Sequence, residues 1–456
     1  MQKRDSIVAV LMLAIFLIPG CQSTGITTLP EEATPTFAAP VTPSPTIGSI
    51  KEPAANERIE MTKWDLWSSG EVTLRGINIH QRLIYEGWDD PEQYGEGSPG
   101  PPFAQEDFDQ LAALGANYVN ISHPGLFSEE PPFELNPDSQ ANLDRLLDMI
   151  AQADMFAVIS FRTGPGRSEF SFMGVSDDDP FGQSHLDDTV WEDQAAQDAW
   201  VDMWKYTADR YRENGTVVGY DLMVEPNANA IFFDIYWPPD FYPAYANTLY
   251  DWNRFYPHII EAIRQVDPDT PILAGAMSWS QVDWLPYLKP TGDPRTVYTF
   301  HQYAPHDYTH QYPNEQGHLP ITYPGKLDLD WDGEMDDLDR DWLTGLLSPV
   351  SEFQSTHGLP VAVNEYGVMR FEPGAAAYLS DLIELLEELG INHALWAWTP
   401  AYLLRYGDMQ EFEYRLGPDM DNLTEPVPNE LLDVIVDNWK QNTIRPSQVV
   451  FVDTGQ

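Results

Sequence analysis

Residues 217–229 read VVGYDLMVEPNAN. A mostly apolar run ends in a glutamate, a proline follows it, and then the chain turns polar. Such a run predicts a buried strand, and the Glu-Pro pair places one carboxylate, Glu225, where that strand ends. A surface turn can have the same sequence, so the meaning of Glu225 depends on the strands around it.

Seven other β-rich runs resemble this one. We expect strands at 72–79, 117–122, 155–161, 217–224, 271–276, 296–303, 360–367 and 393–399. Helical patterns, with apolar residues three and four apart, separate them, for example at 139–153, 198–213, 375–390 and 429–442. This alternation predicts an α/β fold, a single (β/α)8 TIM barrel with elaborated loops. A doubly wound open sheet is the alternative, but no glycine-rich phosphate loop follows the first strand.

The first twenty residues have the pattern of a secretory signal. Lys3 and Arg4 give it a positive start, and the apolar run at 7–18 is too short to cross a membrane comfortably. The run ends in Ile-Pro-Gly-Cys, which resembles the signal of a bacterial lipoprotein and implies that Cys21 becomes a lipid-modified N-terminus. An ordinary cleaved signal with an unrelated cysteine is the alternative.

The sequence therefore divides into four parts. We expect a lipoprotein signal peptide at 1–20, a Pro/Thr-rich tether at 21–56, the barrel domain at 57–442 and a loose C-terminal tail at 443–456. Cys21 is the sole cysteine of the 456-residue chain, so the barrel has no thiol for a disulfide, a metal site or a nucleophile. We expect a secreted, monomeric cell-surface lipoprotein, held at the membrane by its lipid anchor alone.

The formal net charge is -48. Nucleic acids, anionic lipids and polyanionic glycans are poor partners for such a chain, and a neutral ligand fits it better. A solvated acidic surface accounts for most of this charge.

Chemically capable side chains stand near the predicted strand ends: Asn78, His80, Arg162, Glu225, His301, Tyr303, Glu365, Trp396 and Trp398. In barrels of this kind the carboxyl ends of the strands form the active site. Two carboxyl groups on either side of a sugar are what glycosidic cleavage requires. A nearby imidazole or phenol can separate their pKa values, and indole rings can pack on sugar faces.

These residues resemble the motifs of glycoside hydrolase family 5, the cellulase family. The resemblance covers roughly residues 60–440 and rests on RGIN (75–78), VEPN (224–227), FHQYAPHDYTHQ (300–311), VAVNEYGV (361–368) and ALWAW (394–398). Each fragment alone is common, but all five occur in the family's order and at predicted strand ends.

The resemblance implies a role for each matching residue. Glu225 would be the acid/base, with a raised pKa, and Glu365 the nucleophile, about 5–5.5 Å away as in a retaining enzyme. His301 would contact the acid/base and Tyr303 the nucleophile. Trp396 would be the floor beneath the reacting sugar, with Trp398 as the competing candidate.

Three departures from the family pattern affect substrate binding. Val224 stands where the family usually has the asparagine that reaches the sugar 2-hydroxyl, and Asn120 where it usually has an arginine at the end of the second strand. We expect Arg162, one strand further on, to replace that arginine beside Glu365. Three side chains are candidates to replace the missing asparagine: Asn120, Asn227 and Asn229.

The segment DLDWDGEMDDLD at 328–339 has the spacing of a calcium loop. The candidate ligands of a structural Ca²⁺ are Asp328, Asp330, Asp332, Glu334 and Asp339, with Gly333 at the turn. Asp339 is shorter than the bidentate glutamate usual at the last position, and an acidic solvated loop is the alternative.

We therefore expect a retaining glycoside hydrolase that cleaves a neutral β-linked polysaccharide or oligosaccharide, a β-glucan or a mannan, without a cofactor. A non-catalytic carbohydrate-binding lipoprotein on a degenerate barrel is the alternative. The presence of both carboxylates argues against it, because a barrel that only binds sugar has no use for them.

Overall fold

The computed structural model describes residues 58–95, 98–173, 175–176, 178–312, 320–406 and 410–452. The predicted signal peptide and the whole predicted tether, with Cys21, lie outside the described residues. Among the helices of the described residues, none combines the length and the apolar character needed to span a bilayer.

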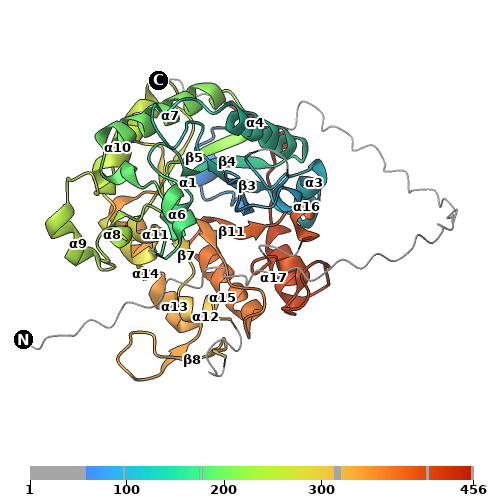
Figure 1. Cartoon of the computed structure of the whole chain (residues 1–456). Coiled ribbons are helices and arrows are strands. Elements are labelled where there is room, and N and C mark those ends of the chain that lie inside the picture. The colour runs from blue at the N-terminus through green and yellow to red at the C-terminus, as the bar shows by residue number, and fades with distance from the viewer. Residues whose placement is uncertain are drawn as a thin grey trace, which may run out of the picture. The chain divides into compact units, whose positions relative to one another are not determined.

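Eight parallel strands close into a barrel in the order β10-β11-β2-β3-β4-β5-β6-β7 (Figure 1). They are β2 (Arg75–His80), β3 (Tyr118–Pro124), β4 (Phe156–Thr163), β5 (Val217–Asp221), β6 (Ile272–Gly275), β7 (Thr296–Gln302), β10 (Val361–Tyr366) and β11 (Asn392–Trp398). All eight predicted strands are confirmed, and so is the (β/α)8 barrel.

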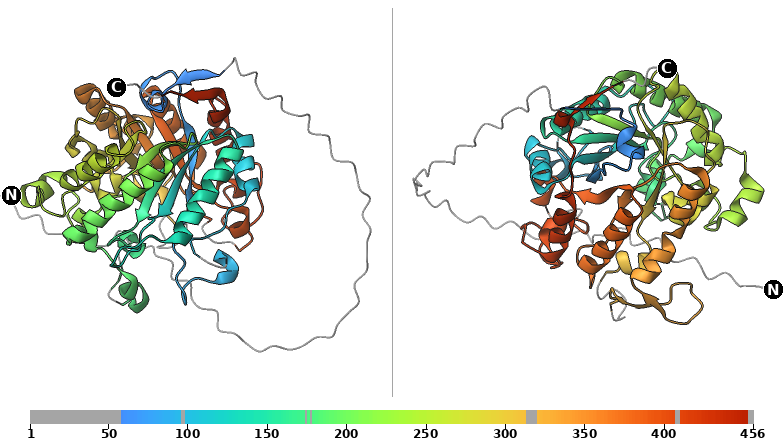
Figure 2. Two further views of the ribbon diagram at one scale, coloured as in Figure 1. Left: turned by 90° about the horizontal axis from the view of Figure 1, so that it is seen from above. Right: turned by 180° about the vertical axis from the view of Figure 1, so that it is seen from behind.

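Long helices cover the barrel on the outside (Figures 1 and 2). They are α3 (Gln105–Leu114), α4 (Pro137–Gln152), α7 (Gln194–Tyr211), α10 (Trp252–Arg264), α14 (Ser348–His357), α15 (Ala375–Glu388) and α17 (Glu430–Trp439). Between β6 and β7 the connection contains only α11 (Met277–Ser280) and a 3-10 turn at Val282–Tyr287. This short crossover leaves the end of β6 close to the neighbouring loops.

Shorter elements elaborate the loops. They are α1 (Asp65–Ser68), α2 (Pro91–Tyr94), α5 (Phe170–Met173), α6 (Pro180–His185), α8 (Ala228–Ile231), α9 (Pro238–Tyr245), α12 (His306–Thr309), α13 (Arg340–Leu346) and α16 (Ala401–Leu404). The β8 (Gly325–Leu327) and β9 (Asp336–Leu338) strands form an antiparallel hairpin apart from the barrel (Figure 1).

Buried tryptophans of the outer helices brace the strand ends that lead to the site. Trp200 and Trp204 of α7 donate their indole N–H groups to the carbonyl of Leu222, at 3.1 Å and 2.7 Å. Trp252 of α10 donates to Gly275 at the end of β6, at 2.9 Å. A buried indole N–H needs such an acceptor. These hydrogen bonds therefore tie the positions of the strand ends to the packing of the helices that cover them.

The two ends of the described domain meet beneath the barrel. The β1 strand (Ile59–Met61) pairs in parallel with β12 (Val449–Phe451), and Met61 and Phe451 pack on a cluster that includes Tyr118 and Phe156, the first residues of β3 and β4. The prediction of a loose tail from 443 is therefore wrong through Val452, because the apolar residues at 449–451 pair and pack.

Candidate active site

Two carboxylates converge at the carboxyl ends of the barrel strands. Glu365 lies in β10, and Glu225 follows β5. One oxygen of each carboxylate and one ring nitrogen of His301, from β7, all lie within 4.8 Å of one another. A retaining glycosidase has its two carboxyl groups about 5–5.5 Å apart, and this close approach of one oxygen from each acid agrees with that arrangement.

The backbone at Glu225 is held in an unusual conformation. Its φ is +57°, the left-handed region, which costs a residue with a Cβ roughly 1 kcal/mol or more. The fully buried guanidinium of Arg167 donates to the carbonyls of Val224 and Glu225, at 2.7 Å each. Pro226 fixes the next φ. The Glu-Pro pair therefore ends the strand by fixing one acid at the barrel mouth.

His301 lies between the two acids. Its Nδ1 is 2.8 Å from Glu225 Oε1 and 3.7 Å from Glu365 Oε2. Burial lowers the pKa of His301, but the charges of Glu365 and Glu225 outweigh burial and raise it to about 9. At neutral pH the ring is therefore a cation that donates its Nδ1 proton to Glu225.

The two carboxyl groups consequently differ in pKa. Burial raises the pKa of Glu365 to about 7, and the charge of Glu225 adds to this effect, while His301 and Arg162 oppose it. Burial also acts on Glu225, but the hydrogen bond and charge of His301 outweigh it and hold the pKa of Glu225 below its usual value. The prediction of a raised pKa at Glu225 is therefore wrong for the free site, because the imidazolium stabilises that carboxylate.

Tyr303 supports the other acid. Its hydroxyl donates to Glu365 Oε1 over 2.8 Å. Both predicted partners, His301 for Glu225 and Tyr303 for Glu365, thus contact their expected carboxylates. Glu225, His301 and Glu365 also have the donor types of a metal site, but these hydrogen bonds already engage one oxygen of each carboxylate, which suits proton transfer.

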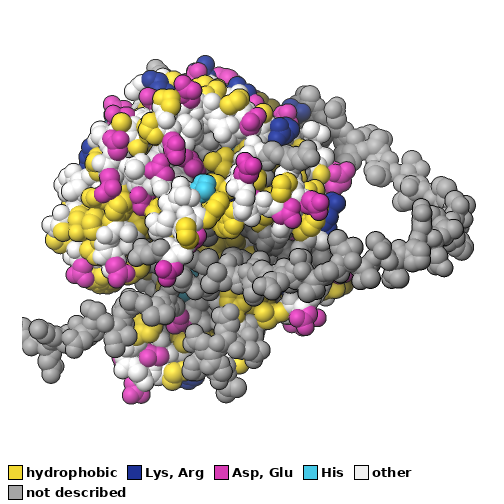
Figure 3. Space-filling model, viewed as in Figure 1, with side chains coloured by type: hydrophobic (Ala, Val, Ile, Leu, Met, Phe, Trp, Pro, Cys, Tyr) yellow, Lys and Arg dark blue, Asp and Glu magenta, His cyan; other side chains and the backbone are white. Residues whose placement is uncertain are grey.

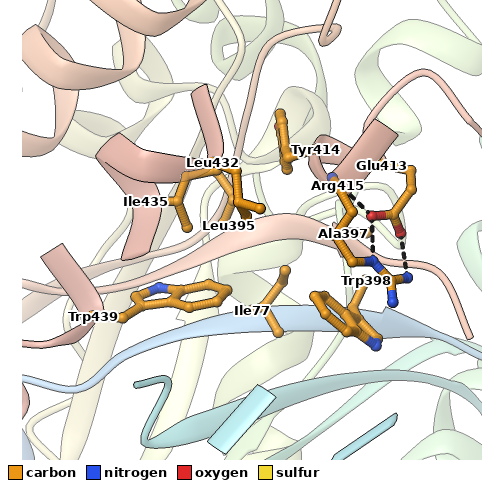
Figure 4. A pocket seen from close by; sticks show the side chains of 10 residues that line it. All are labelled: Ile77, Leu395, Ala397, Trp398, Glu413, Tyr414, Arg415, Leu432, Ile435 and Trp439. Carbon is orange, nitrogen blue, oxygen red and sulfur yellow. Dashed lines mark hydrogen bonds and ion pairs between the residues drawn. The ribbon is translucent and has the colours of Figure 1, made fainter. Parts of the chain in front are cut away.

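The structure separates the two candidate tryptophans of β11. Trp396 is partly exposed at the barrel mouth, where its ring lies 5.6 Å from that of His80. Trp398 is buried under the guanidinium of Arg415, 3.6 Å from its ring, beside Ile77 and Leu395 (Figure 4). Trp396 therefore has a ring that is partly open at the barrel mouth, and the competing candidate Trp398 is wrong because its ring packs inside the protein.

Arg162, at the end of β4, was predicted to lie beside Glu365, but its direct partner is Glu169. Its Nε donates to Glu169 Oε1 over 2.9 Å, and its guanidinium lies 6.0 Å from the Trp396 ring. Within the described protein its ion pair is with Glu169, while Glu225 and Glu365 feel its charge at longer range. Arg162 therefore does not replace the missing arginine as a direct partner of Glu365.

Asn120 does not face the substrate. It lies in the middle of β3, is 2% exposed, and donates to Asn78 Oδ1 and accepts from Ser160, both at 2.7 Å. Asn364 and Asp221 extend this buried network beneath the acids, at 2.6 Å. The prediction that Asn120 binds substrate is wrong, because its amide supports the barrel floor.

The other two asparagine candidates are engaged as well. Asn227 and Asn229 are fully buried, and their amide groups donate to the carbonyls of Ser171 and Ile235, at 3.0 Å and 2.7 Å. Both amide groups are therefore engaged, and the Oδ1 of Asn229 is buried without a hydrogen-bond partner among the described residues.

Sequence reasoning missed three contributors. Arg167 and Glu169 lie in the loop after β4, and their roles depend on tertiary partners; the Gly-Pro-Gly run before Arg167 was the available signal. Trp279 lies in α11 with φ +55° between two other left-handed residues, and its backbone N–H donates to the Pro226 carbonyl over 3.2 Å. Its indole therefore stands beside the acid/base turn, with Tyr236 stacked on it at 6.3 Å.

The acidic segment forms the loop of the β8–β9 hairpin. Carboxylate oxygens of Asp328, Asp330 and Asp332 lie within 4.8 Å of one another. Asp339 instead accepts from the Trp342 backbone N–H at the start of α13, and Glu334 lies outside the cluster of three. The predicted ligand set is therefore wrong for the Asp339 carboxylate, because Asp339 caps a helix, while the ligand predicted from Glu334, its backbone carbonyl, stays a prediction.

The described surface agrees with the charge balance of the sequence. On the face shown in Figure 3, acidic side chains are scattered widely and basic ones are few.

Comparisons with known proteins agree with this geometry. The model of the family described as cellulase (glycosyl hydrolase family 5) matches residues 68–402. Endoglucanase C of Acetivibrio thermocellus is 23% identical over 317 residues, which cover 64% of this chain and 82% of that protein. Cellodextrinase A of Ruminococcus flavefaciens is 21% identical over 296 residues, 65% of this chain and 76% of that protein. The solved structure of endoglucanase Cel5A from Thermotoga maritima superposes with a TM-score of 0.56 at 17% identity, over 82% of this chain and 100% of that one. At this identity the superposition shows a shared fold.

Proposed function

Because this chain belongs to the cellulase family, glycosyl hydrolase family 5, we propose that it hydrolyses a neutral β-linked glucan within the polymer chain. It is a glycoside hydrolase of a family that works with net retention at the anomeric carbon. The observation that supports the proposal most directly is the pair of carboxylates within 4.8 Å, each with its own hydrogen-bond donor.

In the first step, the Glu365 carboxylate attacks the anomeric carbon and the glycosidic C–O bond breaks. Glu225 gives its proton to the leaving oxygen. The His301 ring lies between the two acids, 2.8 Å from Glu225 and 3.7 Å from Glu365, so it passes its proton to Glu225 and takes up the proton that Glu365 loses on ionising. Tyr303 keeps Glu365 oriented for attack.

In the second step, Glu225 takes a proton from water, and the water oxygen attacks the anomeric carbon of the glycosyl ester. The C–O bond to Glu365 breaks, and the sugar leaves with its original configuration. Trp396 supports the reacting sugar throughout, and Trp279 and Tyr236 offer aromatic faces to the leaving group.

The test is release of reducing sugar by the purified full chain from β-glucans, mannan, xylan and xyloglucan, with the product anomer read by NMR. We expect release from a β-glucan, or from mannan, with retained configuration. An inverted product would contradict the roles of Glu225 and Glu365. Binding without release would favour the non-catalytic carbohydrate-binding alternative, which the Val224 departure suggested.

We also propose that the chain is a lipid-anchored, extracellular monomer. The support is the Ile-Pro-Gly-Cys signal at 18–21 and the Pro/Thr-rich stretch after it. Mass spectrometry of the mature N-terminus should find an acylated Cys21, and Cys21→Ser should release the protein from the membrane fraction. An unmodified mature N-terminus elsewhere would contradict the anchor.

We propose, further, that the β8–β9 loop binds calcium. The support is the group of Asp328, Asp330 and Asp332, whose mutual repulsion a hard cation would relieve. Calcium should raise the unfolding midpoint and a chelator should lower it, and Asp330→Ala should abolish the difference. An unchanged midpoint in all three measurements would contradict the site.

A further inference from the structure

A group of polar side chains crosses the interior of the barrel beneath the acids. Each comes from a different strand and is at most 2% exposed: Asn78 (β2), Asn120 (β3), Ser160 (β4), Asp221 (β5) and Asn364 (β10). Since β6 and β7 lie between β5 and β10, the contact of Asp221 with Asn364 passes through the interior. Apolar side chains usually fill such a barrel, and a buried carboxylate is costly. A role beyond filling space is therefore expected of Asp221.

The β10 strand contains one extra residue just before the nucleophile. Its register against β11 shifts by one residue between Val363 and Tyr366, and its register against β7 shifts between Val363 and Glu365. The extra residue belongs to β10 in both pairings. Among these described strands Asn364 has no register partner, so it is the bulged residue.

The bulge allows two consecutive side chains to reach the barrel interior. In a regular strand, neighbouring side chains point to opposite faces. Here the Asn364 amide donates to Asp221 across the barrel over 2.6 Å, while the Glu365 carboxylate lies beside Glu225 and His301. Without the extra residue, one of these two side chains would point outward to the covering helices. The direction of the nucleophile therefore depends on the bulge.

Asn364 is held from inside the barrel at both its backbone and its side chain. Its backbone carbonyl accepts from the amides of Asn78 and Asn120, at 2.9 Å and 3.2 Å. Its own amide donates to Asp221 Oδ2, which also accepts from the Ser160 hydroxyl over 3.0 Å. The Asn364 Oδ1 has no hydrogen-bond partner among the described residues, so the bond to Asp221 is what orients this side chain.

Asp221 is mostly an anion at neutral pH. Burial raises its pKa to about 6, while the charge of His301 and the hydrogen bonds from Ser160 and Asn364 oppose this rise. A hydrogen bond to an ionised acceptor is roughly twice as strong as one between neutral groups. The charge of Asp221 therefore strengthens its hold on the bulge.

We propose that Asp221 is a positioning residue for the nucleophile: it holds the bulge at Asn364 and so directs the Glu365 carboxylate toward the anomeric carbon. The proposal rests on the proposed function, which assigns the attack to Glu365. Asp221 acts through the backbone of β10 and not through the sugar. Loss of its charge should therefore slow the attack by Glu365 and leave sugar binding unchanged.

The test uses the full chain and a dinitrophenyl 2-deoxy-2-fluoro-β-cellobioside, which inactivates a retaining enzyme. Glu365 bonds to the anomeric carbon, dinitrophenolate leaves with the electron pair of the broken C–O bond, and the fluorinated ester hydrolyses slowly. The limiting rate of inactivation reports the attack, and the half-saturating concentration reports binding. Asp221→Asn keeps the shape of the side chain but not its charge, and it should lower the limiting rate about tenfold at unchanged half-saturation. Mass spectrometry should still find one label on every chain, which shows that the variant is folded.

Asp267→Asn is the matched control. Asp267 is also 2% exposed and accepts from the Tyr220 hydroxyl over 2.9 Å, but it precedes β6 and so lies at the end of the barrel opposite the acids. Removing this charge should lower stability and leave both the limiting rate and the half-saturation unchanged.

A double variant tests whether Asp221 acts through Asn364. Asn364→Ala alone should slow inactivation about as much as Asp221→Asn does, because each removes the same hydrogen bond. The two substitutions together should be no slower than the slower single variant, since residues that act through one contact are not additive.

The outcomes separate the positioning role from the proposed function. Equal limiting rates for Asp221→Asn and Asp267→Asn, a loss confined to half-saturation, or additive losses in the double variant would overturn the role of Asp221 while hydrolysis stands. Absence of a label in the unmodified enzyme would overturn the proposed function, and the role of Asp221 with it.

Discussion

Replacing His301 with asparagine should move the pH dependence of nucleophilic attack. The pKa of His301 is raised from 6.5 to about 9, and each unit corresponds to 1.36 kcal/mol. The surroundings therefore favour the imidazolium by about 3 kcal/mol, and since burial acts the other way, the attraction to Glu225 and Glu365 alone is larger. Interaction is reciprocal, so the imidazolium favours the ionised carboxylates by a similar amount.

Without the imidazolium, the pair of carboxyl groups, Glu225 and Glu365, should keep one bound proton up to a higher pH. Glu365 attacks as a carboxylate, so activity rises with pH as this group ionises, near pH 7 in the unmodified enzyme. His301→Asn removes the attraction of the imidazolium for Glu225 and Glu365. Because the two carboxyl groups share this loss of stabilisation, we expect the pH midpoint for Glu365 ionisation to rise by about one unit or more. At pH 6 the rate should fall about tenfold.

The assay is kcat/KM from pH 4 to 10 with a dinitrophenyl β-cellobioside. Its leaving group needs little protonation, so the profile reports Glu365 and not the acid. His310→Asn is the matched control, because this ring lies 5.3 Å from Tyr303 and the charge that acts on its pKa is that of His306, not of a carboxylate. A midpoint that stays near 7 or falls in a folded His301→Asn would refute the reasoning.

Three further outcomes follow from the geometry. Glu225→Gln should lower kcat by about 10²–10⁴-fold on substrates with poor leaving groups and far less on activated aryl glycosides, as steady-state kinetics would show; equal losses would contradict its role as the acid. Trp396→Ala should weaken oligosaccharide binding without a large loss of stability. Trp398→Ala should lower the unfolding free energy, measured by urea unfolding, by about 3–5 kcal/mol. The reverse pattern would mean that Trp398 binds the sugar and Trp396 supports the fold. Glu387→Gln removes the carboxylate that Arg75 grips at 2.5 and 2.6 Å. Burial would raise the pKa of Glu387, but His393 and Arg75 outweigh burial and lower it. The stabilisation from the ionised Glu387 is therefore present above the unfolded pKa of about 4.3 and is lost as pH falls. If the difference in unfolding temperature between Glu387→Gln and the unmodified protein stays undiminished at pH 2, this account is wrong.

The barrel was predictable because each strand is a short apolar run with a polar residue at its end. Glu225, His301 and Glu365 were found for the same reason, since position at a strand end is a local property. The prediction for Asn120 failed because β3 continues to Pro124, four residues further, which leaves Asn120 inside the barrel. Trp398 remained a competing candidate to Trp396 because the register of β11 shifts between Leu395 and Trp398, and alternation alone does not reveal such a shift.

The partners of Arg162 and Arg167 were beyond sequence reasoning for a different reason. Both lie in or beside the loop after β4, and their acceptors come from that loop or from residues near 224. Such contacts form only when the loop folds over the neighbouring strands, and the spacing of residues along the chain does not predict how the loop folds. The pKa order of the two acids likewise follows from the 2.8 Å contact of His301, a tertiary distance.

The pairing of β1 with β12 determines where the described domain begins and ends relative to its site. Both strands pack beneath the barrel, at the end where β3 and β4 begin (Figure 2). The acids stand at the other end, because Glu225 follows β5 and Glu365 lies near the end of β10. Residue 58 therefore leaves the domain on the side opposite the catalytic face. The two ends of the described domain, residues 58 and 452, therefore lie away from the acids, and a polymer can reach the barrel mouth without passing either of them.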